Sequence, residues 1–106
     1  MPVPAFIRPQ AAQDLKDIVT YIEQRSPTAA VRVLNAIRSG IEQVAEAPGI
    51  GTVRLIGGND RLSGLRVWPV SRYRNYLIFY LPTPERLEIV RILHGARNVE
   101  RVLRDE

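Results

Sequence analysis

Hydrophobic residues in the first half of the chain recur with the period of an α-helix. In residues 9–25, apolar positions three and four residues apart form one stripe: Ala12, Leu15, Ile18, Val19 and Ile22. The charged residues of this segment lie off that stripe: Asp14, Lys16, Asp17 and Glu23. Pro9 is typical of the first position of a helix. The pattern therefore predicts an amphipathic helix that buries its apolar stripe.

A second helix is predicted from Ser26 to about Ala47. Ser26 offers an N-cap hydroxyl, Pro27 suits the first helical position, and Pro48-Gly49 ends the segment. Its apolar stripe consists of Ala30, Val33, Leu34, Ile37, Ile41 and Val44. Gly40 lowers the helix propensity by about 1 kcal/mol, which favours a role in close packing. Because the connection between the two helices is so short, we expect an antiparallel hairpin.

After Pro48 the pattern changes to that of β-strands. Four segments rich in Val, Ile, Leu and aromatic residues are separated by turn residues: 52–56, 65–70, 73–81 and 87–93. They predict an antiparallel meander, and the proline-flanked residues 2–7 predict an edge strand before the helices. A short helical tail is expected after Asn98, carrying Val99, Val102 and Leu103.

The sheet is the only partner on which the helical hairpin can bury its stripes. The expected fold is therefore α+β, with the hairpin packed on the sheet in two layers and a single domain over residues 1–106. In the last strand, alternation places Val90, Ile92 and His94 on one face. The residues expected on the other face are Leu87, Ile89, Arg91 and Leu93.

Composition excludes several kinds of chemistry. The 106 residues contain no cysteine and one histidine, which excludes disulfide scaffolds, thiolate nucleophiles and multi-histidine metal sites. We expect no cofactor and no metal. The first ten residues lack the apolar stretch of a signal peptide, and no run approaches the roughly 20 apolar residues of a membrane span. A cytoplasmic protein with no membrane partner is expected.

Basic charge is concentrated in the second half of the chain. Residues 51–106 contain ten arginines and six acidic residues, whereas residues 1–50 contain five basic and five acidic residues. The planar fork of arginine suits carboxylates and phosphates. Such a surface suits an acidic partner, either protein or nucleic acid. The charge alone, however, favours a solvated arginine-rich surface without a specific partner.

His94 is the one side chain of a type that ordinarily changes charge near neutral pH. Cleavage of RNA through the 2′-hydroxyl needs a base, an acid and a cation on the phosphate. Candidates for these roles are His94, Arg74 and Arg91, with Arg72 as a further cation. The sequence offers no second acid–base partner for His94. The alternative is a histidine at a strand end that bonds the chain after Gly95 or belongs to a binding surface.

Three stretches, in this order, resemble the ParE branch of the RelE/ParE toxin superfamily. They are PQAAQDLKDIVTYI at residues 9–22, LRVWPVSRYRNYLIFY at residues 65–80, and IVRILHGARN at residues 89–98. The most specific element is Leu-His-Gly-Ala-Arg at residues 93–97. The resemblance extends over about residues 5–103, and the order and spacing of the three stretches give it its specificity.

The resemblance implies a helical hairpin on an antiparallel sheet and the toxin of a type II toxin–antitoxin module. A ParD-like antitoxin would silence the toxin, and operator DNA would be contacted only through the antitoxin. Studied ParE members poison DNA gyrase, so that DNA breaks accumulate, without chemistry of their own. RelE-like relatives instead cut messenger RNA on the ribosome. A third alternative is a non-toxic module member that acts through complex formation.

Two features favour the gyrase poison over the ribosome-dependent endoribonuclease. Leu77 occupies the place where the nucleases carry an arginine, and the only lysine, Lys16, lies on the first predicted helix. Arg8 departs from the ParE pattern, which usually has serine or another capping residue at that position.

The resemblance and the charge pattern together nominate two groups of binding residues. For the target, we expect contacts from Arg91, His94 and Arg97. For the antitoxin, we expect contacts from Ile18, Ile22, Val31, Arg66, Arg72 and Arg74. In the alternative without a target, Arg91 and Arg97 are surface cations that pair with Glu88 or Glu100 and contribute about 0–1 kcal/mol each.

Overall fold

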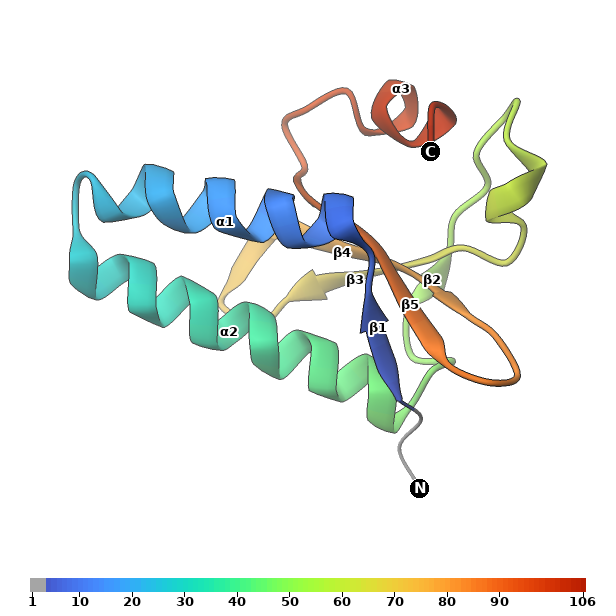
Figure 1. The fold of residues 1–106 in the computed structure, drawn as a ribbon, viewed down its shortest axis with the longest axis horizontal. Coiled ribbons are helices and arrows are strands. Elements are labelled where there is room, and N and C mark those ends of the chain that lie inside the picture. The colour runs from blue at the N-terminus through green and yellow to red at the C-terminus, as the bar shows by residue number, and fades with distance from the viewer. Residues whose placement is uncertain (1–3) are drawn as a thin grey trace.

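The computed structural model describes residues 4–106 and has a five-stranded sheet flanked by helices (Figure 1). The elements are β1 (Ala5–Ile7), α1 (Pro9–Glu23), α2 (Pro27–Glu46), β2 (Thr52–Val53), η1 (Asp60–Leu62), β3 (Arg66–Val70), β4 (Tyr73–Pro82), β5 (Leu87–His94) and α3 (Val99–Arg104). The predicted α+β fold, its helical hairpin and its helical tail are confirmed. Residues 2 and 3 of the predicted first strand lie outside the described residues. Neither α1, α2 nor α3 has the length and apolar character needed to cross a membrane.

The sheet is mixed, in the order β1-β5-β4-β3-β2. Strands β2 to β5 form the predicted antiparallel meander, but β2 spans Thr52–Val53 where five residues were expected. The first strand β1 is an edge strand, as predicted, and pairs in parallel with β5. Strand β1 pairs with only the first part of β5. The last backbone hydrogen bond along this edge is donated by the Arg8 N–H to the carbonyl of Ile89, at 3.0 Å.

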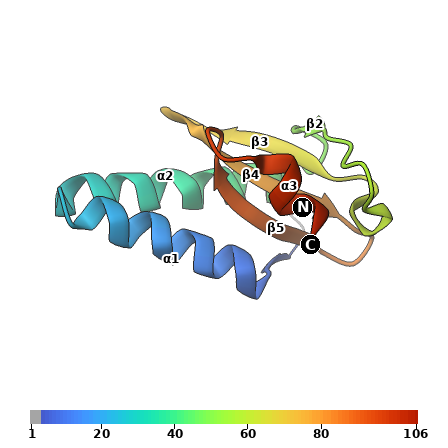
Figure 2. The ribbon, with the colours of Figure 1, turned by 90° about the horizontal axis from the view of Figure 1, so that it is seen from above.

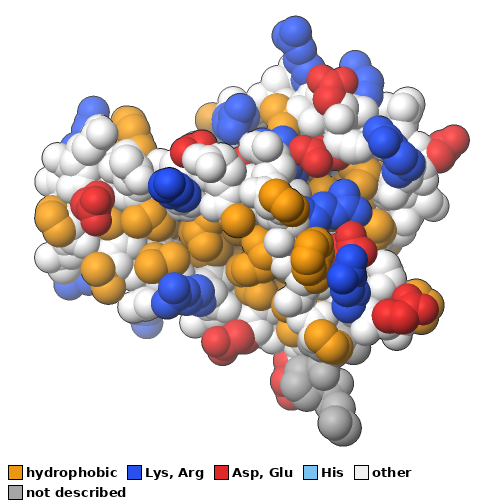
Figure 3. All heavy atoms as spheres, in the orientation of Figure 1, with side chains coloured by type: hydrophobic (Ala, Val, Ile, Leu, Met, Phe, Trp, Pro, Cys, Tyr) orange, Lys and Arg blue, Asp and Glu red, His pale blue; other side chains and the backbone are white. Residues whose placement is uncertain are grey.

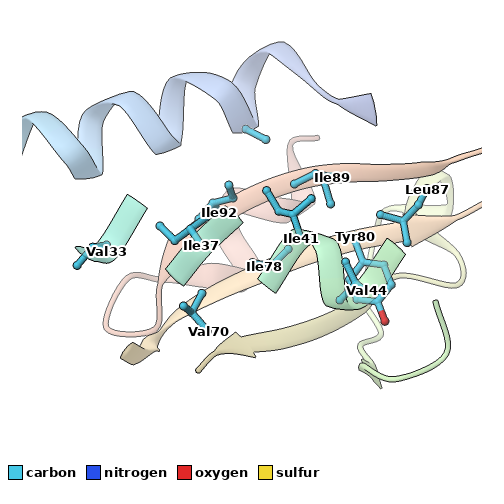
Figure 4. Close-up of a cluster of buried hydrophobic side chains, with 11 residues drawn as sticks. Val33, Ile37, Ile41, Val44, Val70, Ile78, Tyr80, Leu87, Ile89 and Ile92 are labelled. Carbon is cyan, nitrogen blue, oxygen red and sulfur yellow. The ribbon is translucent and has the colours of Figure 1, made fainter. Parts of the chain in front are cut away.

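One face of the sheet packs against the helical hairpin (Figure 2). Side chains of α2 and of the three central strands point toward one another there (Figure 4). This first core cluster consists of Ala11, Val33, Ile37, Ile41, Val44, Val70, Ile78, Tyr80, Leu87, Ile89 and Ile92. Gly40 has the close-packing role expected of it, since a Cβ there would lie 2.7 Å from Cδ1 of Ile78.

The stripe predicted for α1 is rotated in the structure. Ala12 is exposed, whereas Ala11 and the charged Asp14 are buried. Leu15, Ile18 and Ile22 are half-buried against the first core cluster. The expectation that Asp14 lies on an exposed face is therefore wrong, and its burial requires a partner of opposite charge.

The opposite face of the sheet is covered by α3 and the loop that contains η1 (Figure 2). This second core cluster consists of Ile56, Leu62, Leu65, Phe79, Val90, Leu93, Val99 and Leu103. Asn98 caps α3 as predicted, accepting the N–H of Arg101. At the other end of α3, the buried amide of Asn59 donates to the carbonyl of Leu103 at 3.0 Å. A turn residue of the middle loop thus satisfies a carbonyl at the end of the tail helix.

Tyr80 fixes the connection between α2 and β2. Its buried hydroxyl donates to the carbonyl of Pro48 at 2.7 Å and accepts the N–H of Gly51 at 2.8 Å. Burial raises the pKa of Tyr80, so the hydroxyl keeps the proton that it donates. A Cβ at Gly51 would lie 2.6 Å from this hydroxyl and 2.8 Å from the carbonyl oxygen of Val67.

We expect Gly51→Ala to lower the free energy of unfolding by about 1–3 kcal/mol, the usual cost of overpacking. Gly49→Ala is the matched control, because a Cβ at Gly49 meets nothing within 4 Å. Urea denaturation of both variants measures the difference. An equal effect of the two substitutions would contradict the tight approach of Tyr80 to Gly51.

Glu88 links the chain before α1 to the edge of the sheet. Its carboxylate lies 2.9 Å from Arg8 and 3.3 Å from Arg86. The hydrogen bond from Arg8, helped by Arg86, lowers the pKa of Glu88 below its ordinary value of 4.5. A carboxyl group with a lowered pKa in the folded state stabilises the fold above its ordinary value.

This stabilisation is lost as the pH falls through the lower pKa of the folded protein. Glu88→Gln should therefore be less stable than the wild type at pH 7, and the difference should shrink as the pH falls below the ordinary value of 4.5. Thermal denaturation of both proteins from pH 3 to pH 7 tests this. A difference that stays constant over that range would show that the charge of Glu88 contributes nothing.

Candidate functional site

A bulge changes which residues of β5 share a face. The pairing of β4 and β5 shifts between Phe79 and Tyr80, so that Arg91 and Ile89 face consecutive residues of β4 and Val90 is the extra residue. As a result Ile89 and Ile92 both join the first core cluster, while Val90 joins the second. The simple alternation expected for β5 is therefore wrong, because a bulge reverses the alternation beyond it.

Beyond the bulge, Arg91 forms a buried ion pair with Asp14 of α1. Its Nε and Nη2 atoms donate to Oδ2 and Oδ1 of Asp14 at 2.6 and 2.8 Å. Oδ2 also accepts the backbone N–H of Ile92 at 3.0 Å. The exposed fraction is 6% for Asp14 and 8% for Arg91. This is the bidentate arrangement in which arginine and carboxylate bind most strongly.

Arg91 also holds the C-terminal segment. Its Nη1 atom donates to Oε1 of Glu106 at 2.7 Å. Hydrogen bonds to Asp14, and then to Glu106, raise the pKa of Arg91, while burial opposes them. One cation thus ties α1, β5 and the segment after α3 together.

The structure corrects the expected surroundings of Arg91. If Arg91 contacts the target, its guanidinium has to be exposed. In the alternative without a target, Arg91 was expected to form a surface ion pair with Glu88 or Glu100. Instead the group is buried, and both of its carboxylate partners are different residues. Asp14, which lies 77 residues earlier in the chain, was not recognised as a partner. The sequence did contain a signal for the burial of Asp14, because this residue lies on the same face of the helix as the buried Ala11 and the half-buried Ile18.

His94 ends β5 and is half-buried beside Tyr76, with the two rings edge-to-face and 5.2 Å apart. Its Nδ1 atom accepts the backbone N–H of Ala96 at 3.0 Å. The expected bond to the chain after Gly95 is confirmed. This bond requires a lone pair on Nδ1, which assigns the proton of the neutral ring to Nε2. His94 therefore presents a hydrogen-bond donor to a partner.

A small cleft of about 90 Å³ brings His94 and Arg97 together beside α1. Its lining residues are Asp14, Asp17, Ile18, Ile92, Leu93, His94 and Arg97. The Arg97 N–H donates to the carbonyl of His94 at 3.0 Å, so a tight turn fixes the spacing of the two residues. Ligand pockets usually measure roughly 300–1,000 Å³, so this cleft suits one side chain of a partner rather than a nucleotide.

The three candidate catalytic residues do not line one cleft. Arg91 is held by Asp14 and Glu106, and Arg74, exposed near the start of β4, does not line the cleft of His94. Within residues 4–106, no three His, Asp or Glu residues form a group that could hold a metal ion.

The model of a protein family, the ParE toxin of type II toxin–antitoxin systems (parDE), matches residues 5–99. The chain belongs to this ParE toxin family. A solved structure, a chromosomal ParDE toxin–antitoxin system from P. aeruginosa, is similar with a TM-score of 0.70 and 17% sequence identity. The match covers 87% of this chain and 95% of that one, and it supports the fold. No curated protein sequence matches.

The residues nominated for contact with the antitoxin differ in their exposure. Val31 is 57% exposed, whereas Ile18 and Ile22 are half-buried against the first core cluster. Nη1 of Arg66 donates to the carbonyls of Gly49 and Gly51, at 3.2 and 2.6 Å. The guanidinium of Arg66 therefore braces the loop after α2.

Arg72 and Arg74 are both exposed. Arg72 occupies the tight turn between β3 and β4, and Arg74 follows close behind it. Leu77, where a difference from the nucleases was expected from the resemblance, packs against the second core cluster.

We expect Asp14→Asn to lower the free energy of unfolding by about 3 kcal/mol, because it leaves a buried guanidinium with Glu106 as its remaining carboxylate partner. Asp17→Asn on the same helix is the control, since Asp17 is exposed, and should change the stability by less than about 0.5 kcal/mol. Guanidinium denaturation measures both. Equal effects of the two substitutions would show that the pair with Arg91 is not a strong buried one.

Proposed function

We propose that this chain is a ParE-type toxin that acts in the cytoplasm by binding DNA gyrase and trapping DNA breaks. In this proposal a ParD-like antitoxin binds and neutralises it. The toxin performs no chemistry of its own, and it reaches operator DNA only through the antitoxin.

The state of His94 carries this proposal. A general base needs a free lone pair directed at the proton that it removes. In His94 the lone pair of Nδ1 is used by the Ala96 N–H, and Nε2 carries a proton. Arg91, the other candidate of the last strand, is neutralised by two carboxylates. This arrangement supports recognition through hydrogen bonds and disfavours cleavage of RNA.

The proposed contact with gyrase consists of His94 and Arg97. Both offer donors at the cleft beside α1, and Arg97 is exposed. Such donors suit carboxylates of the enzyme or phosphates of its bound DNA. Arg91 acts in this proposal only as a positioning residue, because it fixes the strand that ends in His94.

The proposed antitoxin surface lies on the helical hairpin, whose closed end projects past the sheet (Figures 1 and 2). Hydrophobic side chains gather along this part of the molecule (Figure 3). Val31 and Tyr21 are 57% and 60% exposed there, with the half-buried Ile18 and Ile22 nearby on α1. Exposed apolar groups collected in one place favour a protein partner.

A supercoiling assay with gyrase from the source organism tests the proposal. We expect the purified chain to inhibit supercoiling and to generate linear DNA, and we expect the antitoxin to reverse both effects. The double variant His94→Gln/Arg97→Gln should lose most of the inhibition, because both donors to the target are weakened or removed. Arg101→Gln, which replaces an exposed arginine of α3, should inhibit like the wild type.

A folded double variant that inhibits gyrase fully would contradict the contact assigned to His94 and Arg97. An active gyrase unaffected by the wild type would contradict the proposed target. Ribosome-dependent cleavage of messenger RNA would then identify an endoribonuclease. Antitoxin binding without arrest of growth would identify a non-toxic module member.

A further inference from the structure

A second and larger hollow lies between α2 and the turn that joins β3 to β4. Its volume is about 460 Å³, and its lining residues are Arg32, Asn35, Ala36, Ser39, Gln43, Ser71, Arg72 and Tyr73. The two views of the ribbon agree in placing the tip of the β3–β4 hairpin beside α2 (Figures 1 and 2). We refer to this hollow as the arginine groove. It is separate from the cleft of His94, because the two share no lining residue.

The arginine groove carries positive charge that the fold itself does not compensate. Two of its lining residues are arginines and none is acidic. Within residues 4–106, neither Arg32 nor Arg72 forms an ion pair or donates a side-chain hydrogen bond, as is also true of Arg38 outside the groove, whereas Arg8, Arg66, Arg86 and Arg91 are all engaged in this way. Asn35, Ser39 and Ser71 add neutral donors to the lining of the groove. This set of groups matches an anionic ligand.

The backbone at Arg72 supports a role for its side chain. Arg72 has a φ of +72°, in the left-handed region that favours glycine and asparagine. Either of those residues would form the turn between β3 and β4 with less strain. Strained positions of this kind cluster at binding sites, where the side chain rather than the backbone is needed.

The wall of the groove that α2 forms is held in place by a hydrogen bond to the sheet. Trp68 of β3 donates from its Nε1 atom to Oε1 of Gln43 at 3.0 Å, and Gln43 lines the groove from α2. The spacing between helix and sheet is therefore fixed before a ligand arrives, which lowers the entropic cost of binding. Trp68 is also the only tryptophan of the chain, so its emission reports on this wall.

We propose that the arginine groove binds an acidic segment of the antitoxin, with its carboxylates held by Arg32 and Arg72. This inference rests on the proposed function and adds to it the chemistry of one contact. A nucleic acid is favoured less, because sites for it usually align several cations and aromatic rings along a backbone. The groove instead offers two cations at one hollow of about 460 Å³, which suits a short acidic segment of a peptide.

The first experiment uses an acidic hexapeptide, Gly-Glu-Asp-Glu-Asp-Gly, as the probe, with the same peptide bearing Gln and Asn as its control. Calorimetry should show saturable binding of the acidic peptide only, weakened by salt, together with a change in Trp68 emission. Arg32→Gln and Arg72→Asn should each weaken binding about tenfold. Arg38→Gln, an exposed arginine of α2 outside the groove, should bind like the wild type.

Asparagine suits the conformation at position 72, so Arg72→Asn should be at least as stable as the wild type. A loss of peptide binding in this variant therefore cannot be attributed to unfolding. The proposal would be overturned if the acidic peptide did not bind, or if both arginine variants bound it as tightly as the wild type. Binding to the wild type without a change in Trp68 emission would also overturn it. Binding of an oligonucleotide but not of the peptide would also overturn it and would identify a nucleic-acid site.

The second experiment uses the intact antitoxin with the full chain. We expect Arg32→Gln/Arg72→Asn to dissociate from the antitoxin at least tenfold faster than Arg38→Gln. If the antitoxin binds the wild type and the double variant equally, the assignment of the groove is wrong and the proposed function stands. If it does not bind the wild type, the proposed function is wrong and the assignment falls with it.

Discussion

The ion pair between Asp14 and Arg91 is the interaction on which the rest of the structure depends. Strand β1 covers only the first part of β5, so the backbone of β5 needs another partner beyond Ile89. Asp14 supplies it by accepting the N–H of Ile92, and the same carboxylate neutralises Arg91. Arg91 in turn binds Glu106. A charge buried without this partner would cost several kcal/mol, so the pair fixes where α1 crosses the sheet and where the C-terminal segment docks.

The same ion pair also removes Arg91 from the charged groups that are available to bind partners. Because Arg91 is satisfied inside the fold and Arg66 braces the loop after α2, part of the basic charge of the second half is structural. His94 and Arg97 beside α1, and Arg32 and Arg72 at the arginine groove, are the residues that we propose to contact partners. The cleft of His94 and the arginine groove lie on separate parts of the surface, since they share no lining residue. The surface charge acts mainly on specificity and on the rate of encounter.

Local chemistry made most of the fold predictable. The Ser26-Pro27 start of α2, the Asn98 cap of α3 and the turns between strands depend on neighbouring residues, and all were recognised from sequence. Features that depend on distant residues were missed. The bulge at Val90 has no residue signature and reversed the expected faces of β5. The burial of Asp14 depends on a residue 77 positions away, and the contact of Asn59 with α3 joins residues 44 positions apart. Of the candidate site, His94 and its bond after Gly95 were predictable, whereas the arginine groove forms only when α2 meets the β3–β4 turn.

A double-mutant cycle on Asp14 and Arg91 tests the central claim most directly. The free energies of unfolding of the wild type, Asp14→Asn, Arg91→Gln and the double variant give the coupling between the two side chains. A buried bidentate pair that organises the fold predicts a coupling of about 2 kcal/mol or more. A coupling below about 0.5 kcal/mol, as exposed ion pairs give, would contradict the account, because α1, β5 and the C-terminal segment would then be held together by packing alone.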